Sequence, residues 1–203
     1  MREQGKHAGL QRDQVLATAV DLIDSDGRQG LSMRRLAGEL GVEAMTLYHH
    51  FQNKGALEDA IVEHVLAGSR APSGNRRSWQ AELKRYATGL HNALADHPGI
   101  AQLIATRPAT TTRNLQDLEA LLEIMTGAGF HESTALGAVQ TAAATILGLH
   151  LSHPGSSSDA ASLESASILS SALAHADGSV GTQVEFALTA LIAGFEAQLR
   201  DSA

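Results

Sequence analysis

Cysteine is absent from this 203-residue sequence, and that absence excludes disulfide bonds, thiolate catalysis and cysteine-based zinc sites. Aromatic residues are scarce at 3%, and 22 aspartates and glutamates outnumber 15 lysines and arginines, which gives a net charge of −7. Such a charge provides no overall attraction to nucleic acid. The N-terminus has no apolar signal segment, and no apolar run reaches the roughly 20 residues that cross a bilayer. We therefore expect a soluble, cytoplasmic protein without a membrane partner.

The charges are unevenly distributed along the chain. Residues 1–55 contain seven Lys or Arg and seven Asp or Glu, so the surplus of acid lies beyond residue 55. Within Gly27–Gly55 the balance turns positive, because four basic residues outnumber two glutamates. Exposed charges act over about 8–10 Å at physiological salt. A locally basic segment on an acidic protein can therefore still bind phosphate groups.

Apolar residues recur at helical spacing along nearly the whole chain, which predicts an all-α protein. The stretch GSRAPSGNRRS, from Gly68 to Ser78, has no large apolar residue and is rich in turn-forming residues. It separates a predicted head of residues 1–68 from a predicted body of residues 79–203, with residues 69–78 as the linker. The expected helical segments of the body are residues 79–96, a short element after Pro98, about 111–127, 131–153, about 160–176 and 179–199.

The head contains two short apolar-periodic segments joined at Gly41, which follow an earlier helical segment. This pattern is typical of a helix-turn-helix. Ser32 and Asn53 suit the N-cap positions of the helices that follow them, and Val42 and Leu47 are expected to face inward. A helix-turn-helix presents the outer side of its second helix to the DNA major groove. That outer side consists of Ala44, Met45, Thr46, Tyr48, His49 and His50.

Three rings within this helix, Tyr48, His49 and His50, allow three interpretations. They could form a DNA-binding edge, a catalytic histidine pair, or the solvated face of an ordinary helix. No serine, aspartate or glutamate is spaced to orient either histidine, which weakens the catalytic interpretation. Phe51, the next ring along the chain, is expected in the core.

The segment LSMRRLAGELGVEAMTLYHHFQNKGALEDAI resembles the TetR family of bacterial transcriptional regulators, and it contains the whole TLYxHFxNK signature from Thr46 to Lys54. The stretches GLHNALADHPGIAQLIATRP, LLEIMTGAGF and FALTALIAGFEAQL resemble the C-terminal domain of the tetracycline-repressor subgroup. One residue departs from the pattern. Glu43 stands where many members have serine or threonine, so the second helix should be capped less well.

The resemblance implies a set of DNA contacts, which are Arg34, Ala44, Met45, Thr46, Tyr48, His49, His50 and Lys54. Arg34 would bind a guanine or a phosphate, and Thr46 would touch a base edge or a thymine methyl. Tyr48, His50 and Lys54 would bind phosphate oxygens and fix the register of the protein on the DNA.

Two helical segments of the body suggest a homodimer. Residues 131–153 carry a stripe of mainly small residues, and residues 184–199 are apolar almost all round and must be buried on two sides. The family pairs these helices into a four-helix bundle across a two-fold axis, which supplies the two heads that a palindromic operator needs. The predicted interface residues are Ala135, Ala138, Ala142, Thr145, Leu149, Leu188, Leu191 and Phe195. A large monomeric helical core is the alternative.

A ligand pocket is expected between the helices of the body. Its candidate lining residues are Tyr86, Leu90, His91, Leu94, Leu103, Thr106, Arg107, Leu118, Leu122, Met125, Gln140 and His150. The tetracycline-repressor subgroup holds drug-bound magnesium with a histidine at the position of Leu103, and its drug-contacting asparagine aligns with Tyr86. We therefore expect an apolar or aromatic effector, and neither a cofactor nor a bound metal. His150 and His153 could hold a metal, but the helix dipole also favours histidines near a helix C-terminus.

These features favour a ligand-responsive transcriptional repressor that binds operator DNA as a homodimer. A DNA-binding dimer without a small-molecule effector is the second hypothesis. An enzyme with a helical body is the third, and the sequence shows no nucleophile–base pair or phosphate-binding loop to support it.

Overall fold

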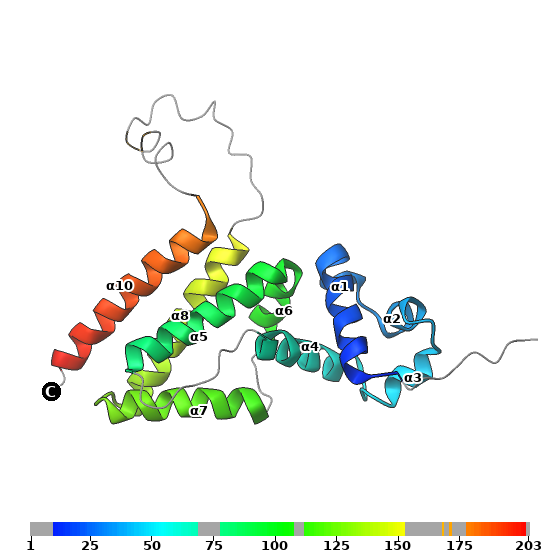
Figure 1. The fold of residues 1–203 in the computed structure, drawn as a ribbon, viewed down its shortest axis with the longest axis horizontal. Helices are drawn as coiled ribbons and strands as arrows, with labels where there is room; N and C mark the ends of the chain where they lie inside the picture. Colours follow the sequence, from blue (N-terminus) through cyan, green and yellow to red (C-terminus); the bar gives the residue numbers. More distant parts are fainter. Residues whose placement is uncertain are drawn as a thin grey trace, which may run out of the picture. The chain divides into compact units, whose positions relative to one another are not determined.

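The computed structural model describes residues 10–68, 78–107, 112–152, 168, 171 and 178–201. Every regular element within these residues is a helix (Figure 1), which confirms the all-α fold class. The chain divides into two compact units. The head unit comprises residues 1–69 and 96–116, and the body unit comprises residues 70–95 and 117–203. Most of the predicted linker, and His153 with the segment after it to residue 167, lie outside the described residues.

The head unit contains α1 (Arg12–Gly30), α2 (Met33–Glu39), α3 (Ala44–Tyr48), α4 (Lys54–Gly68), η1 (Pro98–Ile100) and α6 (Ala101–Thr106). Helix α1 packs against α2, α4 and η1, and α2 packs against α3. Gly27 interrupts α1 with a φ of 70°, a left-handed conformation that glycine tolerates, and the helix then continues to Gly30. The fully buried core side chains of this unit are Leu16, Ile23, Leu31, Leu36, Leu47, Leu57, Ile61, Ile100 and Leu103.

The head unit is larger than the predicted head, because residues 96–116 join it. Asp24 in α1 accepts a hydrogen bond from the Gly99 N–H at 2.9 Å, and its other carboxylate oxygen lies 2.8 Å from His97 Nδ1. A Cβ added at Gly99 would lie 2.5 Å from the Ile23 carbonyl oxygen, so a larger residue could not approach α1 this closely. The predicted boundary at residues 69–78 missed these contacts, because they join segments far apart in the sequence.

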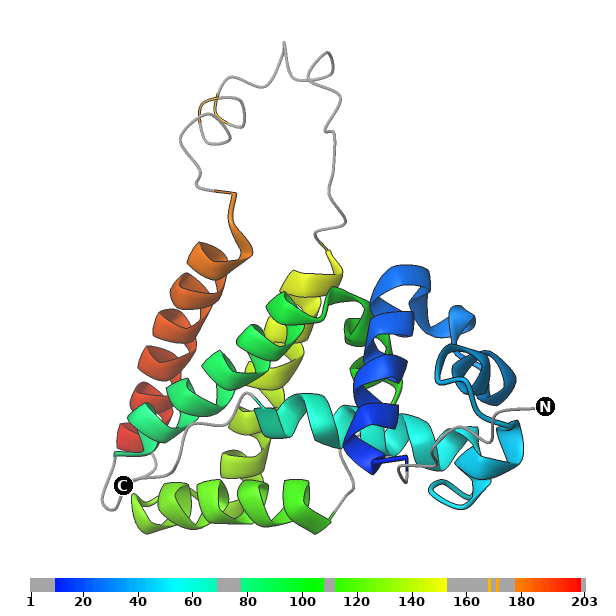
Figure 2. The same cartoon turned by 45° about the vertical axis from the view of Figure 1, so that its right-hand side comes forward.

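The body unit contains α8 (Glu132–Leu151), α10 (Val180–Asp201) and most of α5 (Trp79–Asp96) and α7 (Thr112–Gly127) (Figure 2). The last residue of α5 and the residues of α7 before Asp117 belong to the head unit. Its core side chains are Trp79, Leu83, Leu121, Met125, Phe130, Ala135, Ala138, Val139 and Ala142. Helix α10 packs against α8. It is also joined to α5, because Gln80 donates to Glu196 at 2.8 Å and Lys84 donates to Glu185 at 2.9 Å.

Helix α8 is the one described helix that is long and apolar enough to span a membrane, judged by length and composition. Its apolar residues do not form an unbroken run, because Ser133, Gln140 and Thr141 lie among them. Glu132 is the single charged residue of this 20-residue helix. Core helices of soluble proteins meet the same criteria, and α8 does contribute Ala135, Ala138, Val139 and Ala142 to the body core.

Candidate functional site

The connection between α2 and α3 has the geometry of a helix-turn-helix. Gly41 adopts a φ of 67°, a left-handed conformation that glycine tolerates without strain. The Val42 N–H donates to the Ala37 carbonyl at 3.0 Å, which closes the turn. Ala37 is buried, and its small side chain allows the two helices to approach. Leu47 is fully buried and fixes which side of α3 faces inward.

Side-chain caps set where the neighbouring helices begin. Ser32 Oγ accepts a hydrogen bond from the Arg35 N–H at 3.1 Å, and Asn53 Oδ1 accepts one from the Ala56 N–H at 2.9 Å. Both N-cap predictions are thus confirmed. Glu43 forms no side-chain capping bond at the start of α3, as its departure from the family pattern predicted.

The outer face of α3 exposes both apolar and polar side chains. Met45 is 65% exposed and Tyr48 is 45% exposed, although large apolar and aromatic side chains usually lie inside. His49 is also exposed, and Ala44, Thr46 and His50 are half-buried. Three of the six predicted residues are therefore exposed and three are half-buried, and His49 and His50 directly follow the helix. Their contact with DNA stays a prediction.

The two arginines of α2 lie in different environments. The Arg35 guanidinium pairs with the Asp26 carboxylate and donates to the Gly30 carbonyl at 3.4 Å. The charge of Arg35 is therefore paired within the head unit. Arg34 is exposed on the helix surface, so it is the arginine of α2 with the greater freedom to bind DNA.

Lys54, at the first position of α4, points back toward α1. Its ammonium donates to the Leu31 carbonyl at 2.7 Å and lies 3.8 Å from Glu58 Oε1. The side chain is nevertheless 43% exposed. A DNA phosphate that binds Lys54 would share the ammonium with Leu31, and this phosphate contact stays a prediction.

Phe51 is buried, which confirms its expected place in the core. The guanidinium carbon of Arg12 lies 5.2 Å from the centre of the Phe51 ring, within the range of a cation–π contact. The His50 ring centre lies 6.3 Å from it. Phe51 thus connects α1 to the segment that follows α3.

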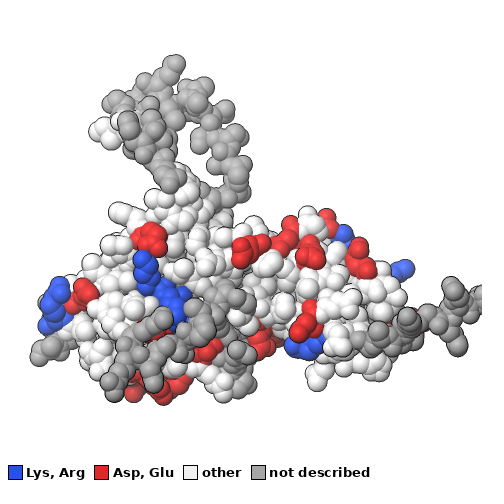
Figure 3. Space-filling model, viewed as in Figure 1, with Lys and Arg blue, Asp and Glu red and all other residues white. Residues whose placement is uncertain are grey.

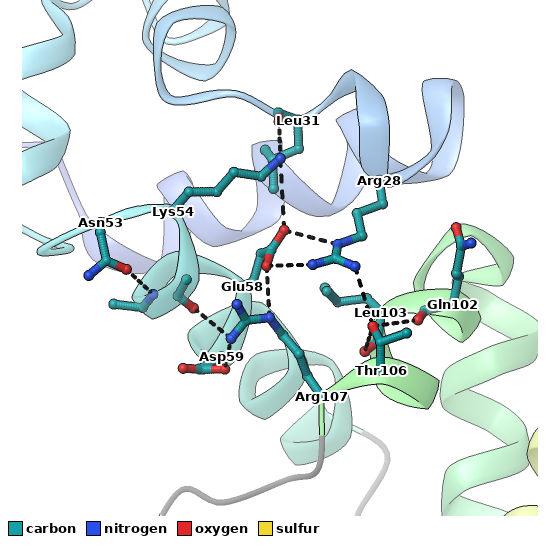
Figure 4. Close-up of polar contacts among 12 residues, drawn as sticks. Arg28, Leu31, Asn53, Lys54, Glu58, Asp59, Gln102, Leu103, Thr106 and Arg107 are labelled. Carbon is teal, nitrogen blue, oxygen red and sulfur yellow. Dashed lines mark hydrogen bonds and ion pairs between the residues drawn. The ribbon is translucent and has the colours of Figure 1, made fainter.

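Glu58 is the centre of a group of ion pairs, shown in Figure 4, which the sequence did not reveal. Its side chain is 3% exposed. Arg28 donates to both carboxylate oxygens, through Nε and Nη2, at 3.1 Å each. Arg107 Nε lies 2.7 Å from Glu58 Oε2 as an ion pair without hydrogen-bond geometry. The Arg107 guanidinium also pairs with Asp59 and donates to the Gly55 carbonyl at 3.3 Å.

The cations around Glu58 determine its protonation. Burial raises the pKa of this carboxyl. The hydrogen bonds and charge of Arg28, together with the charges of Arg107 and Lys54, lower it by more than burial raises it, so the pKa lies below its ordinary value of 4.5. Glu58 raises the pKa of Arg28 in return. The spacing of four residues between Lys54 and Glu58 could have indicated one pair, but nothing in the sequence joins Arg28 or Arg107 to this carboxylate.

The apolar residues of the predicted pocket are mostly part of the core. Leu103 is fully buried in the head unit, and Met125 lies in the core of the body unit. Tyr86, Leu118 and Leu122 pack against that core, and Leu90 and Leu94 are buried. Their role as pocket lining stays a prediction.

The polar residues of the predicted pocket are dispersed. Gln140 is exposed on α8, and its role as pocket lining stays a prediction. Thr106 and Arg107 lie at the end of α6 in the head unit, where the Thr106 hydroxyl donates to the Gln102 carbonyl at 3.0 Å. In the body unit, His91 and His150 meet with a ring nitrogen distance of 2.9 Å.

The predicted dimer residues mostly face inward. Ala135, Ala138 and Ala142 are core residues of the single chain, and Leu188 is 1% exposed. Leu191 and Phe195 pack against the same core, and Thr145 and Leu149 are half-buried. The side chains of the four buried residues are already covered by the chain itself, and the role of all eight residues at a dimer interface stays a prediction.

Two family models match most of the chain. Residues 15–61 match the model described as bacterial regulatory proteins, tetR family, and residues 71–199 match the tetracyclin repressor-like C-terminal domain. The first contains the helix-turn-helix, and the second contains the described part of the body unit up to Leu199.

Individual relatives match this chain over different shares of its length. The class E tetracycline repressor protein from Escherichia coli is 32% identical over 203 residues, covering 95% of this chain and 93% of the relative. An HTH-type transcriptional regulator from Saccharopolyspora erythraea is 33% identical over 129 residues, and the match spans 64% of this chain but only 55% of that relative. A crystal structure of a TetR variant from Acinetobacter baumannii AYE in complex with minocycline has a TM-score of 0.71 and 30% identity, covering 94% of this chain and 98% of that one.

Proposed function

Because this chain belongs to the TetR family of bacterial transcriptional regulators, we propose that it binds a palindromic operator as a homodimer and represses transcription until a small effector releases it. The exposed outer side of α3, held in helix-turn-helix geometry by Gly41 and Leu47, carries this proposal. Members of the family are regulators and not enzymes. A protein that binds operator DNA acts in the cytoplasm of a bacterium.

DNA binding would rest on a few contacts. On the face drawn in Figure 3, acidic side chains are spread over much of the surface, and basic side chains form small separate patches. Met45 offers the thymine methyl an apolar partner, Tyr48 and His50 offer donors to phosphate, and Arg34 offers a bidentate fork to guanine. The Lys54 ammonium adds a cation at the start of α4, where free backbone N–H groups also favour phosphate.

Replacing Arg34 with alanine is expected to relax base preference at one position of each half-site, with a loss of discrimination of about 1–3 kcal/mol. Arg35→Ala is the matched control, because it makes the same change at a neighbouring arginine whose charge pairs with Asp26. Binding of single-base operator variants, measured by fluorescence anisotropy at fixed salt, distinguishes the two. Unchanged preference at every base pair in the Arg34 variant would remove this residue from the proposed recognition set.

The dimer would form through the outward sides of α8 and α10. On α8 the exposed or half-buried side carries Gly137, Thr141, Ala144, Gly148 and Leu151 at spacings of four and three. A Cβ added at either glycine would meet nothing within 4 Å, so there is room for another helix to approach. On α10 the outward side carries Phe186, Ala190, Ala193 and Ala197, and Phe186 is 77% exposed. A two-fold axis would place these stripes against their copies.

The effector is proposed to be apolar or aromatic. Leu103 provides no ligand for a magnesium ion, which takes oxygen donors and few others. Tyr86 packs against the apolar body core and would add a flat ring with one hydroxyl to a binding site there. Minocycline is the ligand of the Acinetobacter protein, and this chain differs from the tetracycline-repressor pattern at the positions that anchor the drug and its metal.

The end of α6 is the proposed route of the signal to the head. Arg107, directly after this helix, holds the carboxylates of Glu58 and Asp59 on α4. A ligand that moved the Thr106–Arg107 segment would therefore pull on α4, the helix that follows the helix-turn-helix. To release DNA more than a hundredfold, the ligand must favour the released state by about 3 kcal/mol.

Magnesium-tetracycline is expected to leave the protein on its operator, whereas an apolar or aromatic compound from a screened set is expected to release it. The measurement is a DNA-release titration with tetracycline, with and without added magnesium and chelator. Magnesium-dependent release by tetracycline would overturn the effector proposal. Failure of every compound, with operator binding intact, would instead favour a dimeric regulator without a small-molecule effector.

A further inference from the structure

His91 on α5 and His150 on α8 point at each other within the body unit. His91 Nδ1 lies 2.9 Å from His150 Nε2, and the two rings are tilted by 46° with their centres 5.1 Å apart. Both residues are half-buried. The helix-turn-helix and the proposed dimer faces make no use of this pair.

We propose that His91 and His150 bind a divalent transition cation of the Cu²⁺, Ni²⁺ or Zn²⁺ type between their facing nitrogens. Imidazole nitrogen binds such a metal at about 2.0–2.1 Å, so two ligands lie about 2.9 Å apart at the roughly 90° angle of Cu²⁺ or Ni²⁺ and about 3.3 Å apart at the tetrahedral angle of Zn²⁺. The observed separation of 2.9 Å therefore suits Cu²⁺ and Ni²⁺, and it must widen by about 0.4 Å for Zn²⁺. The ring that donates the shared hydrogen takes its other neutral tautomer, with the proton on the nitrogen that faces away from the partner ring, and the cation then lies between the two facing nitrogens.

The surroundings set the orientation of the pair. The first turn of α10 lies near the other nitrogen of His91, because a Cβ added at Gly181 would lie 3.8 Å from Nε2. The metal would bind His91 through Nδ1, because this is the nitrogen that faces His150. Among the described residues no group of three histidines, aspartates or glutamates is placed to share a metal, so within this part of the chain the proposed site has two protein ligands.

The donor type decides the metal. Two neutral imidazoles suit Cu²⁺, Ni²⁺ and Zn²⁺, whereas Mg²⁺ prefers carboxylate, carbonyl and water oxygens. The two facing nitrogens must carry no proton in order to bind the metal, so protons compete with the cation for them. This inference depends on the pair alone and not on the proposed effector or operator.

The test is Cu²⁺ binding to the full-length protein. Equilibrium dialysis measures the number of ions bound, and nitrogen couplings in the electron paramagnetic resonance spectrum identify the imidazole ligands. The expected result is one tightly held Cu²⁺ per chain, competed by Zn²⁺ and not by Mg²⁺. His91→Gln and His150→Gln are each expected to abolish the bound equivalent. His64→Gln, which changes a half-buried histidine of the head unit, is the matched control and is expected to retain it.

A second measurement uses the unaltered protein, in case a variant fails to fold. Substoichiometric Cu²⁺ is expected to broaden the imidazole resonances of two histidines before the other eight of the ten in the chain. Uniform broadening of many histidines, retention of Cu²⁺ by both variants, or no bound metal would each overturn the proposal. Operator binding, measured in parallel, shows separately whether the proposed regulatory function holds.

Discussion

Ala144→Arg is expected to convert the dimer into monomers and to lower operator affinity by about 100-fold or more. Ala144 is exposed on the single chain, so an arginine there leaves the body core undisturbed. In the proposed dimer it would place a long charged side chain in a stripe of small residues, and a buried charge without a partner costs about 3–5 kcal/mol. The linked binding of two heads raises operator affinity by a factor of about 10²–10⁴, and a monomer loses this gain.

Light scattering and operator titration measure the two effects on the same sample. Ala95→Arg is the matched control, because Ala95 is an exposed alanine of α5 that belongs to neither proposed stripe. It should remain dimeric with full affinity. A dimeric Ala144→Arg variant would show that the subunits meet elsewhere, and a monomer with undiminished affinity would show that one head suffices.

The head was predictable because its signals are local. Gly41, Ser32 and Asn53 each determine the backbone or the cap within a few residues, and the burial of Leu47 follows from helical spacing. These features required no knowledge of distant contacts. The side of α3 that is exposed could therefore be derived from the sequence.

The orientation of α8 could not be derived in the same way. This helix has small or apolar residues on several sides, so its spacing pattern does not distinguish the stripe of Ala135, Ala138 and Ala142 from the stripe of Gly137, Ala144 and Gly148. Contacts with Trp79 and Met125 decide between them, because they bury the first stripe in the core. Such contacts depend on residues far away in the sequence.

The group around Glu58 was missed for the same reason. Arg28 precedes Glu58 by 30 residues, and Arg107 follows Asp59 by 48 residues. No local sequence pattern connects these residues. Only the folded head unit brings three cations to one carboxylate. We therefore expect the stability of this unit to depend on Glu58.

Glu58→Gln is expected to destabilise the protein by about 2 kcal/mol, because hydrogen bonds to charged groups contribute about 1.5–3 kcal/mol each and a buried partner is left unsatisfied. For a chain of this length that corresponds to a fall in Tm of about 4–8 °C. Asp59→Asn is the matched control. It makes the same change at the next residue, whose side chain is 46% exposed, and a surface ion pair contributes about 0–1 kcal/mol.

The pH dependence of the same variant tests whether the charge of Glu58 is responsible. Its pKa is lowered in the folded protein from an ordinary value of 4.5, so the unfolded chain takes up a proton at Glu58 before the folded chain does. The stabilisation is fully present above the unfolded pKa and is lost as pH falls through the folded pKa. The difference in unfolding free energy between the native protein and Glu58→Gln should therefore be constant near pH 7 and shrink below about pH 4. Denaturant unfolding across this range measures it, and a difference that stays constant into acid would assign the effect to packing instead of charge.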